Sequence, residues 1–133
     1  MGADRTYFLI NGSTAGILAA ILTVCNPGDS VVVPRNVHRS VISGLILSGA
    51  NPVFLMPVYD DDLDIVHGID INDLKETLDA HPTVKSILIV SPTYYGICSD
   101  IKSIVQLAHD RNLSLIVDEA HGAHFGFHPA LPK

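Results

Sequence analysis

Short apolar runs rich in β-branched residues alternate with segments of helical character along this chain, and this alternation limits the fold more than any other feature. Several runs lack an alternating polar face, which is typical of strands buried on both sides of a parallel sheet. The predicted strands are Tyr7–Ile10, Ser30–Val33, Val53–Met56, Ser86–Val90 and Leu113–Val117.

The segments between these runs carry the signals of helix ends. Thr14–Cys25 and His38–Leu47 both stop at clusters of turn-forming residues. Asp70 and Asp100 stand where the N-caps of two further helices are expected, the second helix being Ile101–Arg111. The alternation therefore predicts a three-layer α/β fold, with a mainly parallel sheet and helices on both faces.

Composition disfavours several classes of protein. Eight Lys and Arg against 14 Asp and Glu give a formal net charge of −6 with no basic run, which argues against a nucleic-acid partner. No apolar stretch is long and clean enough to span a membrane, and no signal-peptide pattern is present. The isolated thiols Cys25 and Cys98 predict a reduced, cytoplasmic protein.

The chain is also apolar for a free-standing domain. Of its 133 residues 47% are hydrophobic and only 17% are charged. A domain of this size normally needs more charge to cover its surface. The composition therefore suits part of a larger protein, with faces that other protein covers.

Four turns follow the predicted strands at the edge where parallel sheets bind ligands. They hold most of the chemically capable side chains and comprise Asn11–Thr14, Pro34–His38, Pro92–Gly96 and Asp118–His121. We therefore expect one ligand site at the carboxyl ends of the strands.

The first of these turns begins the sequence Asn-Gly-Ser-Thr-Ala-Gly at Asn11–Gly16. Free N–H groups, the helix dipole and the hydroxyls of Ser13 and Thr14 favour an anion, so the pattern predicts a phosphate cup. The alternative is an ordinary Ser/Thr N-cap beside a glycine turn. No Gly-Lys-Ser/Thr follows, so the pattern is not a Walker A loop.

Asp118 and His38 are candidate contacts for a flat, nitrogen-containing ring. Asp118 ends the most apolar predicted strand, where its carboxylate could hold a protonated ring nitrogen. An N-cap, or a buried carboxylate bonded to backbone, is the alternative for this residue. His38 could stack on a planar cofactor, or it could be a surface histidine that starts a helix.

Two groups of residues suggest metal chemistry, but we predict no metal site. His121, His124 and His128 have ligand-like spacing, although the glycines and prolines among them oppose one regular helix face. A histidine-based metal protein is kept as an alternative hypothesis. The acidic run Asp60–Asp62 with Asp64 lacks the glycine and the closing Glu of an EF-hand loop, so it predicts a solvated acidic turn.

Taken in order, these motifs resemble the fold type I enzymes that depend on pyridoxal phosphate (PLP). The resemblance rests on NGSTAG, the turn NPGD, the loop SPTYYG and the segment DEAHGAHFGF. Within that fold, PRNVHRS at Pro34–Ser40 is similar to the Orn/Lys/Arg decarboxylases. The resemblance covers nearly the whole chain. It implies that residues 1–133 are part of the PLP-binding major domain, and that the family's small C-terminal domain is absent from this chain.

The resemblance also implies roles for individual residues. Ser13 and Thr14 would bind the phosphate of PLP, and His38 would stack on its ring. Asp118 would pair with the ring nitrogen.

Three further residues complete the implied site. Ala120 would pack under the ring, and Thr93 would lie in the wall near the ring hydroxyl. His121 would lie near cofactor and substrate, and it is a candidate catalytic residue.

In the family, a lysine within a Ser-x-His-Lys stretch carries PLP as a Schiff base, and no lysine here matches that pattern. Lys75 and Lys102 lie in predicted helices, and Lys85 precedes a strand at the end opposite the expected site. Lys133 has no Ser-x-His before it. The resemblance implies a parent enzyme that decarboxylates arginine, lysine or ornithine to CO₂ and a polyamine or diamine. We expect the chain itself to be inactive.

Two alternatives stay open: an aminotransferase or carbon–sulfur lyase of the same fold, or a non-catalytic domain that binds a phosphate-bearing ligand. The resembled fold has the strand order 3-2-4-5-6-7-1. Tyr7–Ile10 would then lack its native neighbour, and Leu113–Val117 would present an apolar edge. Such edges pair with other chains. We therefore predict self-association into a homo-oligomer, or a rearranged position for the first strand.

Overall fold

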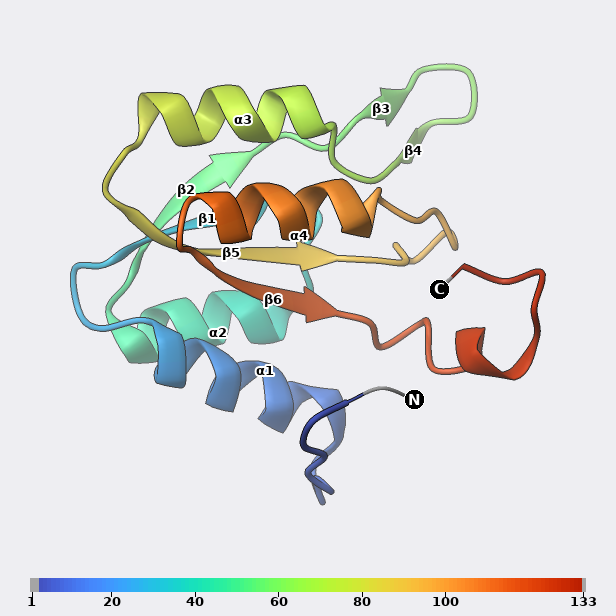
Figure 1. Ribbon diagram of the computed structural model, residues 1–133, viewed down its shortest axis with the longest axis horizontal. Helices are drawn as coiled ribbons and strands as arrows, with labels where there is room; N and C mark the ends of the chain where they lie inside the picture. The colour runs from blue at the N-terminus through green and yellow to red at the C-terminus, as the bar shows by residue number, and fades with distance from the viewer. Residues whose placement is uncertain (1–2, 133) are drawn as a thin grey trace.

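The computed structural model describes residues 3–132, which form three layers around one four-stranded sheet (Figure 1). The sheet has the order β2-β1-β5-β6, and every neighbouring pair is parallel. Its strands are β1 (Ser30–Pro34), β2 (Asn51–Leu55), β5 (Val84–Val90) and β6 (Ser114–Asp118). This order is the 3-2-4-5 part of the order implied by the resemblance, so the predicted α/β fold is confirmed.

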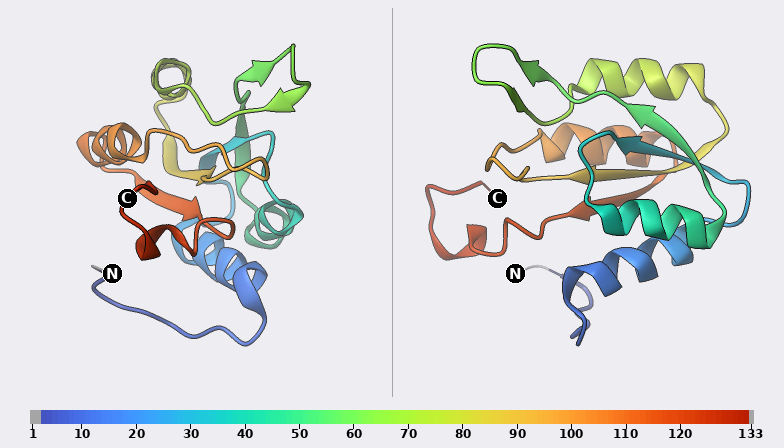
Figure 2. Two further views of the ribbon diagram at one scale, coloured as in Figure 1. Left: turned by 90° about the vertical axis from the view of Figure 1, so that its right-hand side faces the viewer. Right: turned by 180° about the vertical axis from the view of Figure 1, so that it is seen from behind.

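Helices cover both faces of the sheet, two on each (Figures 1 and 2). One face carries α1 (Gly12–Val24) and α2 (Arg39–Ser48), and the other carries α3 (Ile71–Ala80) and α4 (Ile101–Asp110). Within the described residues no helix combines the length and apolar character that crossing a membrane requires.

Neighbouring residues of β1 belong to two different cores, one on each face. Val31 and Val33 pack with Ile17, Ile21 and other residues of the α1/α2 side. Val32 packs with the α3/α4 side. Because successive strand residues point to opposite faces, a strand covered on both sides must be apolar throughout. This is why the β-branched runs located the strands.

The predicted N-caps of α3 and α4 are confirmed. The Asp70 carboxylate accepts hydrogen bonds from the N–H groups of Asn72 and Asp73. The Asp100 carboxylate accepts one from the Ser103 N–H, at 3.2 Å. Hydrogen bonds from the Ser103 hydroxyl and N–H hold the pKa of Asp100 below its usual value. The two caps therefore fix where both helices begin.

The predicted strand at Tyr7–Ile10 is wrong. The segment has no strand conformation, and the side chains of Phe8 and Ile10 are almost fully exposed. A strand requires a neighbouring backbone to complete its hydrogen bonds, and no described strand lies beside this segment. It leads into α1 instead, where the Leu9 side chain approaches Gly16 so closely that a β-carbon there would lie 2.9 Å from Leu9 Cδ1.

A small antiparallel hairpin between β2 and α3 has no counterpart in the sequence prediction. Its strands are β3 (Tyr59–Asp60) and β4 (Ile65–Val66), and residues 61–64 form its exposed tip. The Asp60 carboxylate accepts hydrogen bonds from the N–H groups of Asp62 and Leu63, which shapes the turn. The acidic run is thus the solvated turn predicted for it.

Candidate ligand-binding site at the carboxyl end of the sheet

A cavity of about 510 Å³ lies at the carboxyl ends of β1, β5 and β6. Residues of all four turns singled out in the sequence line it, together with Ser40 and Val90, which flank two of these turns. Its size falls within the range of about 300–1,000 Å³ that small-molecule sites occupy. The strand order therefore brings the four turns together around one space.

Ser13 and Thr14 lie in the first turn of α1 and line this cavity. The N-cap of α1 is Asn11, which makes no side-chain capping hydrogen bond within the described residues. Gly12 follows with a φ of 64°, a left-handed conformation that suits glycine. Neither hydroxyl residue is the cap, so the first-turn N–H groups and both hydroxyls are available to an anion.

Asp118 is the last residue of β6, is buried, and lies opposite Val90 in the register of β5 and β6. Its Oδ1 accepts a hydrogen bond from the Ala120 N–H at 3.2 Å. The same side chain lines the cavity. The backbone contact that was the alternative reading of Asp118 is therefore present, and it fixes the orientation of a carboxylate that also faces a ligand space.

His38 is the N-cap of α2, and its exposed ring lines the cavity. The Ser40 N–H donates to His38 Nδ1 at 3.2 Å, and the Ser40 hydroxyl lies 2.8 Å from the same nitrogen. Both interpretations of His38 therefore hold, because it starts a helix and also lines the cavity. The cap orients the ring.

Ala120 and His121 also line the cavity, whereas Thr93 does not. Thr93 is buried beneath its loop, where its Oγ1 accepts a hydrogen bond from the Ile97 N–H at 3.3 Å. Its hydroxyl is thus engaged within the loop, and the predicted place for Thr93 in the cavity wall is corrected. Tyr94, the next residue, lines the cavity instead.

Sequence reasoning did not single out several residues that line this cavity: Asn11, Gly12, Asn36, Ser40, Val90 and Tyr94. Most of them lie within the sequence motifs NGSTAG, PRNVHRS and SPTYYG, which were identified from the sequence. Asn36 also ties the site to the hairpin, because its side-chain amide donates to the His67 carbonyl at 3.3 Å. The motifs therefore predict which turns form the cavity, but they do not predict which side chain of a turn faces it.

The three histidines considered for a metal have separate surroundings. His121 lines the cavity, the His124 ring packs on Phe125, and His128 Nδ1 accepts from the Ala130 N–H. They lie on turns around the short 3₁₀ helix η1 (Phe125–Phe127) rather than on one helix face. Within residues 3–132, no three His, Cys, Asp or Glu side chains gather as a metal site would require.

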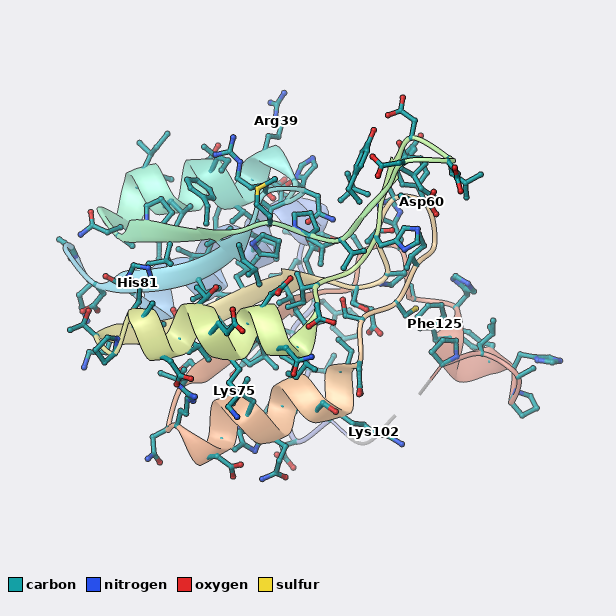
Figure 3. All side chains as sticks on the ribbon, turned by 90° about the horizontal axis from the view of Figure 1, so that it is seen from above. Arg39, Asp60, Lys75, His81, Lys102 and Phe125 are labelled. Atoms are coloured by element: carbon teal, nitrogen blue, oxygen red, sulfur yellow. The ribbon has the colours of Figure 1, made fainter. Side chains whose placement is uncertain are left out.

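The described lysines all lie away from the cavity walls. Lys75 and Lys102 project from α3 and α4 (Figure 3). Lys85 lies near the amino end of β5, at the opposite edge of the sheet, as predicted. Lys133 lies outside the described residues.

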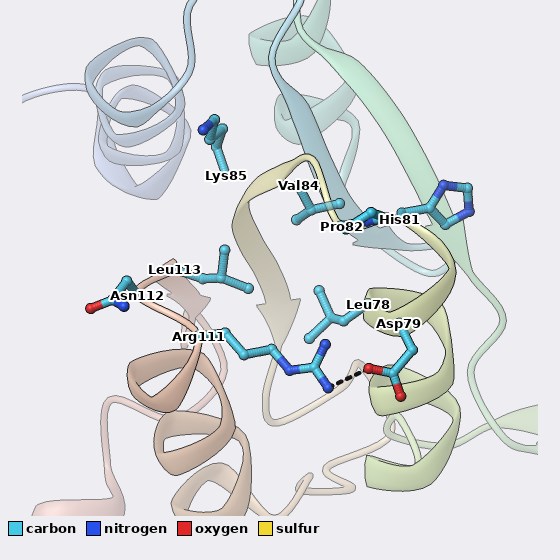
Figure 4. Close-up of a pocket in the computed structure, with 9 residues that line it drawn as sticks. All are labelled: Leu78, Asp79, His81, Pro82, Val84, Lys85, Arg111, Asn112 and Leu113. Atoms are coloured by element: carbon cyan, nitrogen blue, oxygen red, sulfur yellow. Dashed lines mark hydrogen bonds and ion pairs between the residues drawn. The ribbon is translucent and has the colours of Figure 1, made fainter.

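A second cavity, of about 530 Å³, opens near the amino ends of β5 and β6 (Figure 4). Its main polar contact is internal, because the Arg111 guanidinium donates to the Asp79 carboxylate at 2.6 Å. Lys85 extends away from this pair (Figure 4). Arg111 and Lys85 therefore do not point toward a common ligand position. The better candidate for a ligand site is the cavity at the carboxyl ends of the strands.

The sequence of this chain is similar to those of known decarboxylases. The arginine decarboxylases of Bacillus subtilis (strain 168) and Halalkalibacterium halodurans are 45% and 48% identical to this chain over 131 residues. Those residues are 98% of this chain but only 27% of the length of either relative.

Solved structures show the same fold. N-succinyldiaminopimelate aminotransferase from Mycobacterium tuberculosis matches 81% of this chain and 28% of its own, with a TM-score of 0.68 and 26% identity. NtdA from Bacillus subtilis, solved with bound cofactor PMP, matches 84% of this chain and 24% of its own, with a TM-score of 0.65 and 28% identity.

The family model for the Orn/Lys/Arg decarboxylase major domain matches residues 1–133. Because that match covers the whole chain, including the turns that form the cavity, the chain belongs to the Orn/Lys/Arg decarboxylase family.

Proposed function

We propose that this chain forms the cofactor-holding part of a PLP-dependent decarboxylase that acts on arginine, lysine or ornithine. The observation that carries the proposal is one cavity lined by Ser13, Thr14, His38 and Asp118. These side chains suit, in turn, a phosphate, a flat ring and a protonated ring nitrogen. Membership of the decarboxylase family supports the basic amino-acid substrate.

The chemistry of the cavity walls fits PLP. The first turn of α1 offers N–H groups and hydroxyls to a phosphate dianion. The imidazole of His38 and the small side chain of Ala120 line the same space. Asp118 contributes a buried carboxylate, the group that a pyridinium nitrogen requires.

Each wall residue then has a defined task. Bound PLP supplies an electron-accepting ring for the electrons released when CO₂ leaves. Asp118, oriented by the Ala120 N–H, holds a proton on the ring nitrogen. Ser13 and Thr14 fix the phosphate, and the His38 ring shields one side of the site from water. His121, at the cavity wall, is placed to accept or donate a proton near the substrate.

The proposal is tested by titrating the purified chain with pyridoxamine 5′-phosphate (PMP). PMP has no aldehyde, so it cannot form a Schiff base with a surface lysine. We expect saturable binding in a calorimetric titration, with much weaker binding of pyridoxamine, which leaves the phosphate cup unfilled. Absence of saturable PMP binding would remove the proposed function. PMP and inorganic phosphate bound equally well would favour a non-catalytic phosphate site.

The same preparation, supplied with PLP, is expected to release no CO₂ from arginine, lysine or ornithine. The reason is that none of Lys75, Lys85 and Lys102 lines the cavity. Release of labelled CO₂ from any of the three substrates would contradict this expectation.

We further propose that the protein is cytoplasmic, because Cys25 and Cys98 are both free thiols. We also propose that it self-associates, with β6 as one contact. β6 is an edge strand of the sheet, with Leu115, Ile116 and Val117 only partly buried. An unpaired apolar edge favours pairing with a second chain. Sedimentation velocity at rising protein concentration is expected to show species larger than the 14.3 kDa monomer. A single monomer boundary at every concentration would contradict the proposal.

A further inference from the structure

Tyr94 occupies an unusual position in the cavity wall. It lies in the loop that follows β5, it lines the cavity, and 83% of its surface is exposed. An aromatic ring left open to solvent beside a ligand space gains contact area when a ligand arrives. Its neighbour Tyr95 is also exposed, at 55%, but does not line the cavity. The loop therefore presents two adjacent tyrosines, of which one faces the site.

The loop that carries Tyr94 is closed by hydrogen bonds between residues that flank Tyr94 in the sequence. The Thr93 N–H donates to the Ile97 carbonyl at 2.8 Å, and the Gly96 N–H donates to the Thr93 carbonyl at 2.9 Å. At the base, the Ser99 N–H donates to the buried Ser91 Oγ at 3.1 Å. These hydrogen bonds fix the backbone at Tyr94 and therefore the position from which its exposed ring projects.

A second loop contacts the Tyr94 ring. The Tyr94 and His121 rings meet edge to face, with centroids 5.9 Å apart and planes at 88°. His121 follows β6, so this contact joins the turns after β5 and β6 across the cavity. The Ile69 N–H also donates to the Ser99 hydroxyl at 3.2 Å, which links the loop to the segment before α3.

We propose that Tyr94 is a ligand-contacting residue that covers the ring of an aromatic phosphate ligand. The inference rests on the proposed function, because PMP is the aromatic phosphate used as a probe. The contact is made by the face or edge of the phenyl ring, so the Tyr94 hydroxyl is dispensable for binding.

Calorimetric titration of the whole chain with PMP tests this contact in Tyr94→Ala, Tyr94→Phe and the matched control Tyr95→Ala. Loss of one aromatic contact to a ligand ring is expected to weaken PMP binding roughly fivefold or more in Tyr94→Ala. Tyr94→Phe is expected to bind PMP as the parent chain does. The Tyr95 ring meets the Tyr94 ring edge to face, with centroids 5.6 Å apart, but does not line the cavity, so Tyr95→Ala is expected to lose clearly less affinity than Tyr94→Ala. Because Tyr94 is exposed, all three variants should melt like the parent chain.

The outcomes separate this inference from the proposed function. If the parent chain binds PMP and Asp118→Ala weakens it, but Tyr94→Ala does not, the role of Tyr94 is overturned and the proposed function stands. Equal losses in Tyr94→Ala and Tyr95→Ala would indicate general loosening of the loop and would also overturn it. A parent chain that does not bind PMP overturns both.

Discussion

Replacement of Asp118 by alanine is expected to weaken PMP binding by roughly 10- to 150-fold, because hydrogen bonds to charged groups are worth about 1.5–3 kcal/mol. The carboxylate is buried at the end of β6 and already oriented by the Ala120 N–H. It would therefore meet the ring nitrogen without reorganisation. Calorimetric titration of the variant measures the loss.

Asp118→Asn separates charge from shape in this experiment. The amide oxygen can still accept from the Ala120 N–H, so the turn is expected to keep its shape, while the negative charge is gone. Glu119→Gln is the matched control, because it removes the charge of the adjacent, exposed carboxylate, which does not line this cavity. Affinity unchanged in Asp118→Asn, or reduced as much in Glu119→Gln as in Asp118→Asn, would contradict the assignment.

Leu88→Ala is expected to destabilise the fold by about 2–5 kcal/mol, the usual cost of a cavity in a packed core. Leu88 is 0% exposed and lies in β5, which pairs with β1 on one side and β6 on the other. Total stabilities of natural domains are about 5–15 kcal/mol, so this single change removes a large fraction. Urea denaturation followed by circular dichroism measures the free energy of unfolding.

Leu47→Ala is the matched control for this prediction. It makes the same substitution in α2 at a leucine that is 64% exposed. A surface change of this kind is expected to shift the free energy of unfolding by about 0.5 kcal/mol or less. Similar losses in both variants would show that the core does not lie where Leu88 is placed.

The strands of the central sheet could be predicted because both of their faces are covered. Ser86–Val90 is apolar enough to mark β5 from sequence alone, since Ile87 and Leu88 belong to opposite cores. Tyr7–Ile10 is also apolar but has no neighbouring strand among the described residues, so its composition predicted a strand that pairing does not support. The two-residue strands β3 and β4 are too short to show a period.

The candidate site was predictable as a set of turns and less so as a set of side chains. Asp118 was identifiable because it ends a strand, where the direction of the chain dictates which edge it faces. Thr93 and Tyr94 are adjacent in an irregular loop, where no periodicity assigns one to the interior and the other to the cavity. Hydrogen bonds to Ile97 decide that choice, and they depend on how the loop closes.

The cavity walls are drawn from segments as far apart in the chain as residues 11–14 and 118–121. An unfolded chain cannot present them together, so a ligand of this cavity binds only the native state. At a free concentration one hundred times its Kd, such a ligand adds about 2.7 kcal/mol to the free energy of unfolding. Occupancy of the site and the thermal stability of the whole domain are therefore thermodynamically linked, and a thermal-shift screen of small anions and flat rings would detect a ligand of this cavity without any catalytic assay.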